Sequence, residues 1–171
     1  MEDCRKFKSY NDVEMIDIIH QVATLYIATK VPKDYGTGDT YTSVEVHMLK
    51  RIVDKPGITV TELAVETAKT KGAISQMLKK IEEKGLIRRE HSADNENKCL
   101  LYATEKGREL DQAHRLYDEV NSAETIDQVR MLFTEEEMNT AFRVLEAWLA
   151  LRRQVHQKRL KQKRLDSRKK T

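Results

Sequence analysis

Apolar residues recur at helical spacing along most of this sequence. In residues 11–30 they stand at Ile16, Ile19 and Val22, a pattern that predicts an amphipathic helix. A segment with one proline and two glycines follows at residues 31–41 and predicts a loop. The first quarter of the chain is therefore expected to form one helix and one loop.

Two segments of the form Thr-x-x-Glu mark the starts of the next two helices. They run from Thr42 to Glu45 and from Thr59 to Glu62. Such a capping box satisfies backbone N–H groups in the first turn of a helix. A Pro-Gly pair at 56–57 separates the two helices. The apolar positions that we expect them to bury are Val46, Leu49, Ile52, Val53, Leu63 and Ala64.

A fourth helix is predicted after a turn of about three residues. Thr70 is its expected N-cap, and Ile74, Leu78 and Ile81 recur at positions i, i+4 and i+7, which gives the helix a buried stripe. Gly85 stands where a glycine commonly follows a helix C-cap. Two β-like runs, LIRREH and NKCLLYA, then flank the turn segment SADNE. They predict a β-hairpin directly behind the fourth helix.

Two long amphipathic helices account for the rest of the chain. The first is expected to begin near Thr104, and Thr134 with Glu137 forms a capping box for the second. Together with the N-terminal helix they carry more apolar surface than the central unit can cover. This surplus predicts a homodimer through residues 8–30 and 105–160. Beyond residue 160 the apolar spacing lapses, so we expect residues 161–171 to be a frayed basic tail.

Charge changes this picture in one place. The 171 residues have a net charge of +3, but residues 152–171 hold ten Lys and Arg against one acid. Residues 1–151 therefore hold 21 basic and 27 acidic residues, a net charge of −6. Any affinity for nucleic acid must come from local basic patches rather than from the overall charge.

Several classes of protein lack support in this sequence. No apolar run approaches the roughly 20 residues that span a bilayer, so no membrane partner is expected. Two cysteines far apart in sequence, Cys4 and Cys99, fit a reducing compartment, and we expect a cytoplasmic protein. The sequence has neither a Gly-rich phosphate loop nor a His-Glu-x-x-His motif, and we expect no enzyme and no required cofactor.

A short helix, a tight turn, a longer helix and a hairpin are the parts of a winged helix–turn–helix. We therefore predict a mainly α fold with a small β-wing: residues 42–106 form the winged unit within one domain, 1–171. The second helix of such a unit fits the major groove of B-DNA. Small residues at its start let the backbone approach the bases, Gln76 suits adenine, and lysines suit phosphates. The candidate DNA contacts are Thr59, Thr70, Lys71, Gly72, Ala73, Ser75, Gln76, Lys79, Lys80, Arg88, Arg89 and Lys98.

The run from Ser43 to Gly107 resembles the MarR family of bacterial transcriptional regulators. The similar pieces are VHMLKRIVDKPGITVTELA, TKGAISQMLKKIEEKGLIRRE and LYATEKG. The resemblance implies a triangular homodimer that reads a pseudo-palindromic operator in double-stranded DNA. It also implies repression that a small effector relieves. A winged-helix module that binds proteins instead of DNA is the alternative, because basic helix faces are often only solvated surface.

Two features depart from the family pattern. The turn before the fourth helix reads Thr67-Ala68-Lys69, where the family usually has an apolar residue and a glycine. The wing tip lacks the arginine that enters the minor groove in the family, and Lys98 is the nearest base.

Three kinds of effector are open. A metal such as zinc is suggested by His114 and Asp118, which share a helix face at i and i+4, together with His47. Zinc-sensing members of the MarR family draw ligands from the helix that carries His47 and the helix that carries His114, so the resemblance implies a site there. A peroxide signal would need Cys4. A small organic effector is suggested by four tyrosines, Tyr10, Tyr26, Tyr35 and Tyr41.

Overall fold

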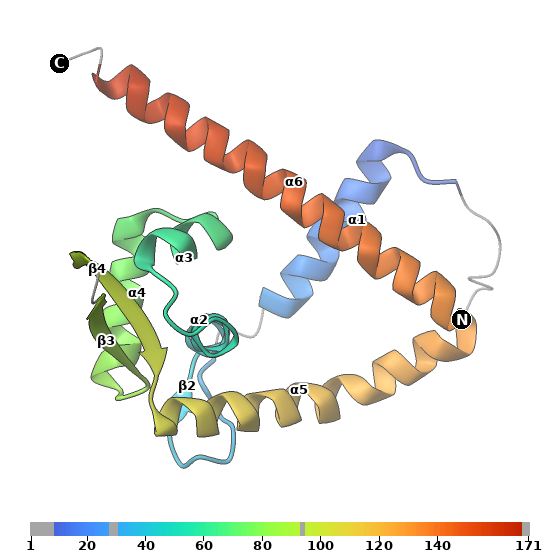
Figure 1. The fold of residues 1–171 in the computed structure, drawn as a ribbon. Coiled ribbons are helices and arrows are strands. Elements are labelled where there is room, and N and C mark those ends of the chain that lie inside the picture. Colours follow the sequence, from blue (N-terminus) through green and yellow to red (C-terminus); the bar gives the residue numbers. More distant parts are fainter. Residues whose placement is uncertain (1–8, 28–30, 93–94, 169–171) are drawn as a thin grey trace.

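The computed structural model describes residues 9–27, 31–92 and 95–168 (Figure 1). Its elements follow the predicted order. The helices are α1 (Asp12–Ile27), α2 (Ser43–Asp54), α3 (Val60–Glu66), α4 (Lys71–Glu83), α5 (Glu105–Leu132) and α6 (Glu135–Arg168). The strands are β1 (Lys33–Asp34), β2 (Thr40–Tyr41), β3 (Ile87–Ser92) and β4 (Asn95–Ala103). The mainly helical winged fold is confirmed. Within the described ranges, no helix combines the length and the apolar content that a bilayer crossing requires.

The core lies inside the winged unit, where α2, α3, α4, the β3–β4 hairpin and the start of α5 meet. Ile74, Leu78 and Ile81 of α4 are fully buried there, as their spacing predicted. Each such side chain contributes roughly 1.5–3 kcal/mol by leaving water. Their partners from the other elements are Leu49, Ile52, Leu63, Leu86, Leu101 and Leu110.

Local capping explains where the helices begin. The carboxylate of Glu45 accepts from the backbone N–H of Thr42 at 2.7 Å, and the Thr42 hydroxyl accepts from the Glu45 N–H at 3.3 Å. Thr59 and Glu62 repeat this reciprocal pair at 2.9 and 3.2 Å. The predicted capping boxes at the starts of α2 and α3 are therefore confirmed, and the same pattern at Thr134 begins α6.

The turn between α3 and α4 closes on an unusual residue. Ala68 has φ +54°, in the left-handed region that favours glycine. On either side of it, the Lys69 N–H donates to the Ala64 carbonyl at 3.1 Å, and the Ala68 N–H to that of Val65 at 3.3 Å. These bonds form a Schellman-type helix end with alanine at the glycine position. The turn thus keeps a left-handed helix end although the sequence offers no glycine for it.

Residues 31–41 are not the plain loop that their composition predicted. Strands β1 and β2 pair antiparallel in register Lys33 to Tyr41 and Asp34 to Thr40. The Asp34 carboxylate accepts from three successive backbone N–H groups, those of Gly36, Thr37 and Gly38, at 2.8, 3.0 and 3.2 Å. Asparagine and aspartate organise turns through such local bonds. The expectation of a loop missed this side chain's role.

Two hydrogen bonds and a close backbone contact hold the winged unit to the beginning of α5. Thr104 donates from its N–H to the Leu86 carbonyl at 3.0 Å and from its hydroxyl to the Gly85 carbonyl at 2.7 Å. Gly107 lies so close that an added Cβ would sit 2.1 Å from the Leu86 carbonyl oxygen. The C-terminal end of α4 and the beginning of α5 are thus held at one point.

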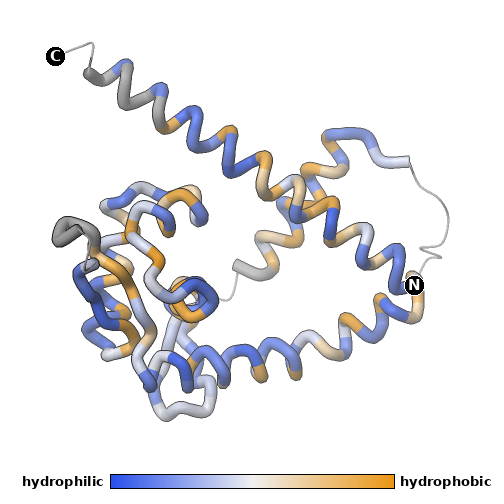
Figure 2. The backbone as a smooth tube through the Cα atoms, in the orientation of Figure 1, coloured by the Kyte–Doolittle hydropathy of each residue, from blue (hydrophilic) through white to orange (hydrophobic). Residues whose placement is uncertain are grey.

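The long helices extend away from this unit. Figure 1 shows α5 running along its lower edge and α6 returning above α3 and crossing α1. Many apolar side chains on the three helices are exposed in the single chain, and Figure 2 shows them as orange stretches between blue ones. They include Val13, Val22, Leu25, Leu116, Val120, Phe142, Val144, Leu145 and Leu149. The predicted apolar surplus is therefore present.

The end of α6 differs from the prediction. The expected fraying beyond residue 160 is wrong, because the helix continues to Arg168. Lysine, arginine, glutamine and leucine all have good helix propensity, and cations near a helix C-terminus interact favourably with its dipole. Helical structure in this segment therefore does not require the apolar stripe whose lapse motivated the prediction.

Candidate nucleic-acid interface

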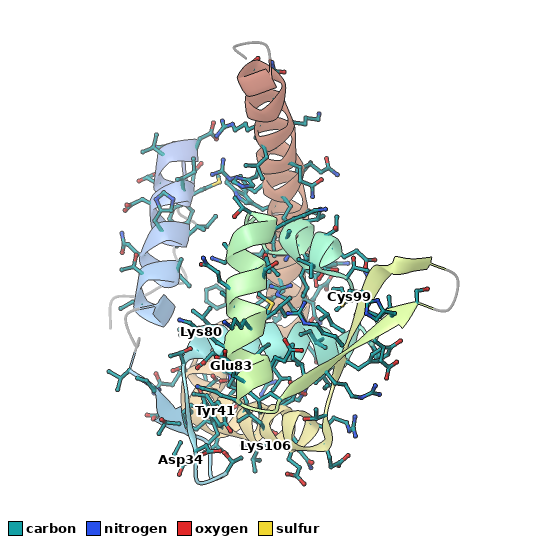
Figure 3. All side chains as sticks on the ribbon, turned by 90° about the vertical axis from the view of Figure 1, so that its left-hand side faces the viewer. Asp34, Tyr41, Lys80, Glu83, Cys99 and Lys106 are labelled. Carbon is teal, nitrogen blue, oxygen red and sulfur yellow. The ribbon has the colours of Figure 1, made fainter. Side chains whose placement is uncertain are left out.

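Helix α4 presents one face to the core and the opposite face to solvent. The inner face is the buried stripe of Ile74, Leu78 and Ile81. Figure 3 looks onto the outer side of this helix, with Lys80 and Glu83 labelled. All the predicted contact residues of the helix are exposed, namely Lys71, Gly72, Ala73, Ser75, Gln76, Lys79 and Lys80. The structure therefore has the exposed face that the sequence predicted on this helix, while its contact with DNA stays a prediction.

The beginning of α4 is suited to an anion. The Thr70 hydroxyl accepts from the Ala73 N–H at 3.2 Å, which confirms the predicted N-cap. No acidic residue stands in the first turn, and Lys71 adds a positive charge there. Free N–H groups and the helix dipole at such an end attract phosphate oxygens.

The remaining cations of the interface differ in their pairing. Arg89 Nε lies 2.9 Å from Glu82 Oε2, and Lys79 Nζ lies 3.8 Å from Glu83 Oε1. Arg88 pairs with Glu90 and stands 5.0 Å from the centre of the Tyr102 ring. Lys71 and Lys80 form no ion pair with any carboxylate of the described residues. These two lysines are therefore the cations of α4 that are most ready to meet phosphate.

Two further predicted contacts have less clear positions. Thr59 is half-buried, and its hydroxyl donates to Glu62 at 2.8 Å, so this side chain already serves the start of α3. The side chain of Lys98, like residues 93–94 at the wing tip, lies outside the described part of the structure. The wing contact expected at Lys98 stays a prediction.

A histidine pair joins α2 to α5. The rings of His47 and His114 meet edge-on, with centroids 5.0 Å apart, and Tyr35 meets His114 in the same way at 5.2 Å. His114 Nε2 lies 3.5 Å from Asp118 Oδ2. Burial lowers the pKa of His114, while the nearby Asp118 charge opposes this shift. Among the described residues, the buried His114 Nδ1 has no hydrogen-bond partner.

These residues were the predicted zinc ligands. The structure brings His47, His114 and Asp118 together, as the prediction required. However, nowhere in residues 9–27, 31–92 and 95–168 do three or more His, Cys, Asp or Glu side chains converge on a point that could hold a metal ion. The arrangement therefore does not fit a preformed zinc site.

A groove of about 630 Å³ lies between α6 and the winged unit. Its apolar lining includes Val44, Met48, Met77, Leu149 and Val155. Five Lys or Arg side chains surround these residues: Arg51, Lys69, Arg152, Arg153 and Arg159. The single acid in the lining, Glu66, lies 3.8 Å from Arg51 and 3.5 Å from Lys55. The groove lining therefore combines apolar side chains with an excess of positive charge.

The groove is not where the sequence placed an organic effector. Of the four tyrosines suggested for that role, Tyr10, Tyr35 and Tyr41 do not line it. Tyr41 is 1 % exposed in the core, Tyr35 packs on His114 and Tyr117, and the side chain of Tyr26 lies outside the described residues. The sequence reading missed the groove because α2, the α3–α4 turn and α6 are far apart in the chain.

The two cysteines give no further site. Cys4, the residue suggested for a peroxide signal, lies outside the described residues. Cys99 is half-buried on β4.

Comparisons with known proteins agree with this architecture. A model of the MarR family matches residues 40–96. The transcriptional regulator HosA of Escherichia coli O157:H7 is 32 % identical over 69 residues, which cover 40 % of this chain and 51 % of HosA. The chain thus spans about half the length of this curated relative.

Solved structures extend the similarity to most of the fold. Streptococcus pneumoniae FabT, crystallised in complex with DNA, superposes with a TM-score of 0.60 at 19 % identity, over 82 % of this chain and 94 % of FabT. Lactococcus lactis ZitR, a zinc-responsive MarR family member, superposes with a TM-score of 0.55 at 21 % identity, over 78 % of this chain and 94 % of ZitR. At such identities the likeness concerns the fold. Together with the match over residues 40–96, it shows that the central part of this chain is similar to the winged helix–turn–helix unit of the MarR family.

Proposed function

We propose that this protein is a sequence-specific DNA-binding regulator of transcription that acts as a homodimer, most simply as a repressor. The observation that carries the proposal is the outer face of α4. Its N-terminal end is suited to binding an anion, and small residues, Ser75 and Gln76 can approach base edges. Lys71 and Lys80 pair with no carboxylate of the described residues. All of them lie opposite the buried stripe that fixes the helix in the winged unit.

The dimer follows from the exposed apolar faces of α1, α5 and α6. These faces are too extensive for a monomer to leave in water, and a second copy of the chain covers them with the same residues. Two winged units related by a two-fold axis would then meet two half-sites of a pseudo-palindrome. The relatives support this assignment, since HosA is a transcriptional regulator and FabT has been crystallised with DNA.

The test is a selection of bound sequences from a random duplex library by the purified full chain. We expect an enriched motif with two related half-sites, and a gel shift of that motif which unrelated duplex does not compete away. A winged-helix module that binds proteins would enrich no motif, and its weak DNA affinity would disappear at physiological salt. That outcome would overturn the proposed function.

We further propose that the effector is a small organic anion with an apolar body, bound in the groove beside α6. The groove volume lies in the range of small-molecule sites, and its five cations outnumber its one acid. Thr67, Ala68 and Lys69 of the turn before α4 contribute to the lining, as does Met77 of α4 itself. An occupant would thus touch the segment that sets the position of the reading helix.

Zinc at His47, His114 and Asp118 is the second candidate effector. The unpartnered His114 Nδ1 favours it, and ZitR is a zinc-responsive relative in fold. The described residues oppose it, because among them no three His, Cys, Asp or Glu side chains converge as metal ligands would. Zinc bound to the native state would raise the melting temperature, and His114→Ala would abolish the gain while His156→Ala would keep it. Equal melting with zinc and with chelator would exclude zinc as the effector.

A further inference from the structure

We infer that the C-terminal part of α6, residues 152–168, is a rigid basic arm that contacts DNA phosphates beside the sequence read by α4. The inference rests on the proposed DNA binding and adds a second, sequence-independent contact surface to it. The partner chemistry is the regular phosphate backbone of a duplex rather than its base edges.

The first argument is the segregation of charge within one helix. Residues 152–168 contain eight Lys and Arg and one acid, Asp166. The first turn of the same helix is acidic, with Glu135, Glu136 and Glu137. Since residues 1–151 have a net charge of −6, the arm is the largest concentration of positive charge in the chain. A polyanion approaching this protein is therefore attracted to the arm.

The second argument is the course of the helix. Arg152, Arg153 and Arg159 lie along the groove beside the winged unit, and the helix then continues from residue 160 to Arg168. At 1.5 Å per residue, this continuation extends roughly 13 Å further. Figure 1 shows the end of α6 projecting past α3 towards the side of the molecule where α4, β3 and β4 lie. Figure 3, viewed from that side, shows α6 rising above α4, so one ligand can approach both.

The third argument is that the described cations of the arm are not neutralised inside the chain. Arg152, Lys158 and Arg159 are exposed. Within the described residues, no carboxylate forms an ion pair with any of the three. By contrast, Arg115 of α5 forms two ion pairs, at 2.6 Å with Asp54 of α2 and at 2.7 Å with Asp111 of α5. A continuous helix also presents its charges with little further ordering, which lowers the entropic cost of binding.

The experiment measures DNA affinity of the full-length protein between 50 and 200 mM salt. The probes are the duplex enriched from a random library and an unrelated duplex of the same length. Lys158→Gln/Arg164→Gln removes two positive charges from the arm. Arg130→Gln/Arg143→Gln removes the same charge near the bend between α5 and α6. A chain ending at Leu160 lacks six Lys and Arg residues, of which Arg164 is one, and also Asp166.

Each lost phosphate contact should make the slope of log K against log salt shallower by about 0.9. We expect the arm variant to lose up to about four such contacts per dimer, the truncated chain to lose more, and the bend variant to keep the parental slope. The arm variants should retain the parental ratio of affinities for the enriched and unrelated duplexes. If the salt dependence of DNA binding has the same slope in the arm and bend variants, the inference about the arm is overturned and the proposed function is left intact. If the parent protein itself enriches no motif from the random library, both the proposed function and the inference about the arm are overturned.

Discussion

The Lys69 N–H donates to the carbonyl of Ala64 at 3.1 Å, across a residue that takes a left-handed conformation without being glycine. This bond fixes the end of α3 and the angle at which the chain enters α4. The conformation of Ala68 costs roughly 1 kcal/mol relative to glycine, because its Cβ crowds the neighbouring carbonyl. The position of the reading helix thus depends on a turn that is held under strain.

Ala68→Gly should therefore stabilise the fold. We expect the free energy of unfolding to rise by about 0.5–1 kcal/mol, with the gain limited by the greater entropy of glycine in the unfolded chain. Urea denaturation measures the change. Ala123→Gly, at an exposed position within α5, is the control and should instead destabilise by up to about 1 kcal/mol. A loss of stability in Ala68→Gly would show that the turn is not strained as its φ angle indicates.

Gln76 and Lys80 should contribute to DNA binding in different ways. Gln76→Ala should weaken the preference for one base position by about 1–3 kcal/mol per half-site, since it removes a bidentate base contact. Lys80→Ala should lower the affinity for all duplexes alike and make its salt dependence shallower, since it removes only a phosphate contact. Competition gel shifts with single-base variants of the enriched motif separate the two effects. If neither variant differs from the parent, α4 is not the reading helix.

The dimer should depend on the exposed apolar face of α6. We expect the protein to sediment as a dimer at micromolar concentration and Phe142→Asp to shift it towards the monomer, because a charge would be buried in the interface. Thr140→Asp adds the same charge two residues earlier, on the opposite side of α6, and should leave the dimer intact. A parental chain that sediments as a monomer would contradict the proposed assembly.

The groove should bind an amphipathic anion. We expect 8-anilinonaphthalene-1-sulfonate to become fluorescent on binding and Arg153→Gln to lower its affinity by about tenfold, the effect of one charge-assisted contact of about 1.4 kcal/mol. Arg130→Gln, with its guanidinium outside the groove, is the matched control. Equal affinities of the two variants would show that the dye binds elsewhere.

Glu62 should contribute to the loss of folding stability at low pH. The Thr59 N–H and hydroxyl, with Lys55, lower the pKa of Glu62 from 4.5 to about 2. The bonds favour the carboxylate, so their contribution to stability is complete above about pH 4.5 and is lost as the pH falls towards about 2. Glu62→Gln should flatten the dependence of unfolding free energy on pH in that window, and Glu146→Gln should not. Parallel pH profiles for the parent and Glu62→Gln would refute this contribution.

Much of the winged unit was predictable because its signals are local. Ile74, Leu78 and Ile81 define a buried stripe by spacing alone, and Thr59 with Glu62 marks a helix start within four residues. The groove was not predictable in this way. Arg51, Lys69 and Arg153 become neighbours only through the course of α6, which depends on packing between distant segments.

The candidate zinc residues lie between these two cases. The i, i+4 spacing predicted that His114 and Asp118 share a face, and the resemblance suggested a nearby His47. Neither could show that the two imidazoles stack edge-on, because ring orientation follows from the packing of α2 against α5 and from Tyr35.

The fastening of Thr104 to Gly85 and Leu86 has a mechanical consequence. With the Gly107 backbone pressed against the Leu86 carbonyl, the first turn of α5 cannot bend separately from the end of α4. Helix α5 has 28 residues and a length of about 42 Å. A tilt of about one degree at this joint therefore moves its far end by about 0.7 Å. In the proposed dimer, a movement of the far end of α5 at the subunit interface would therefore rotate α4 together with it. The distance between the two α4 helices, and so the spacing of the two half-sites, would then depend on contacts far from the bases.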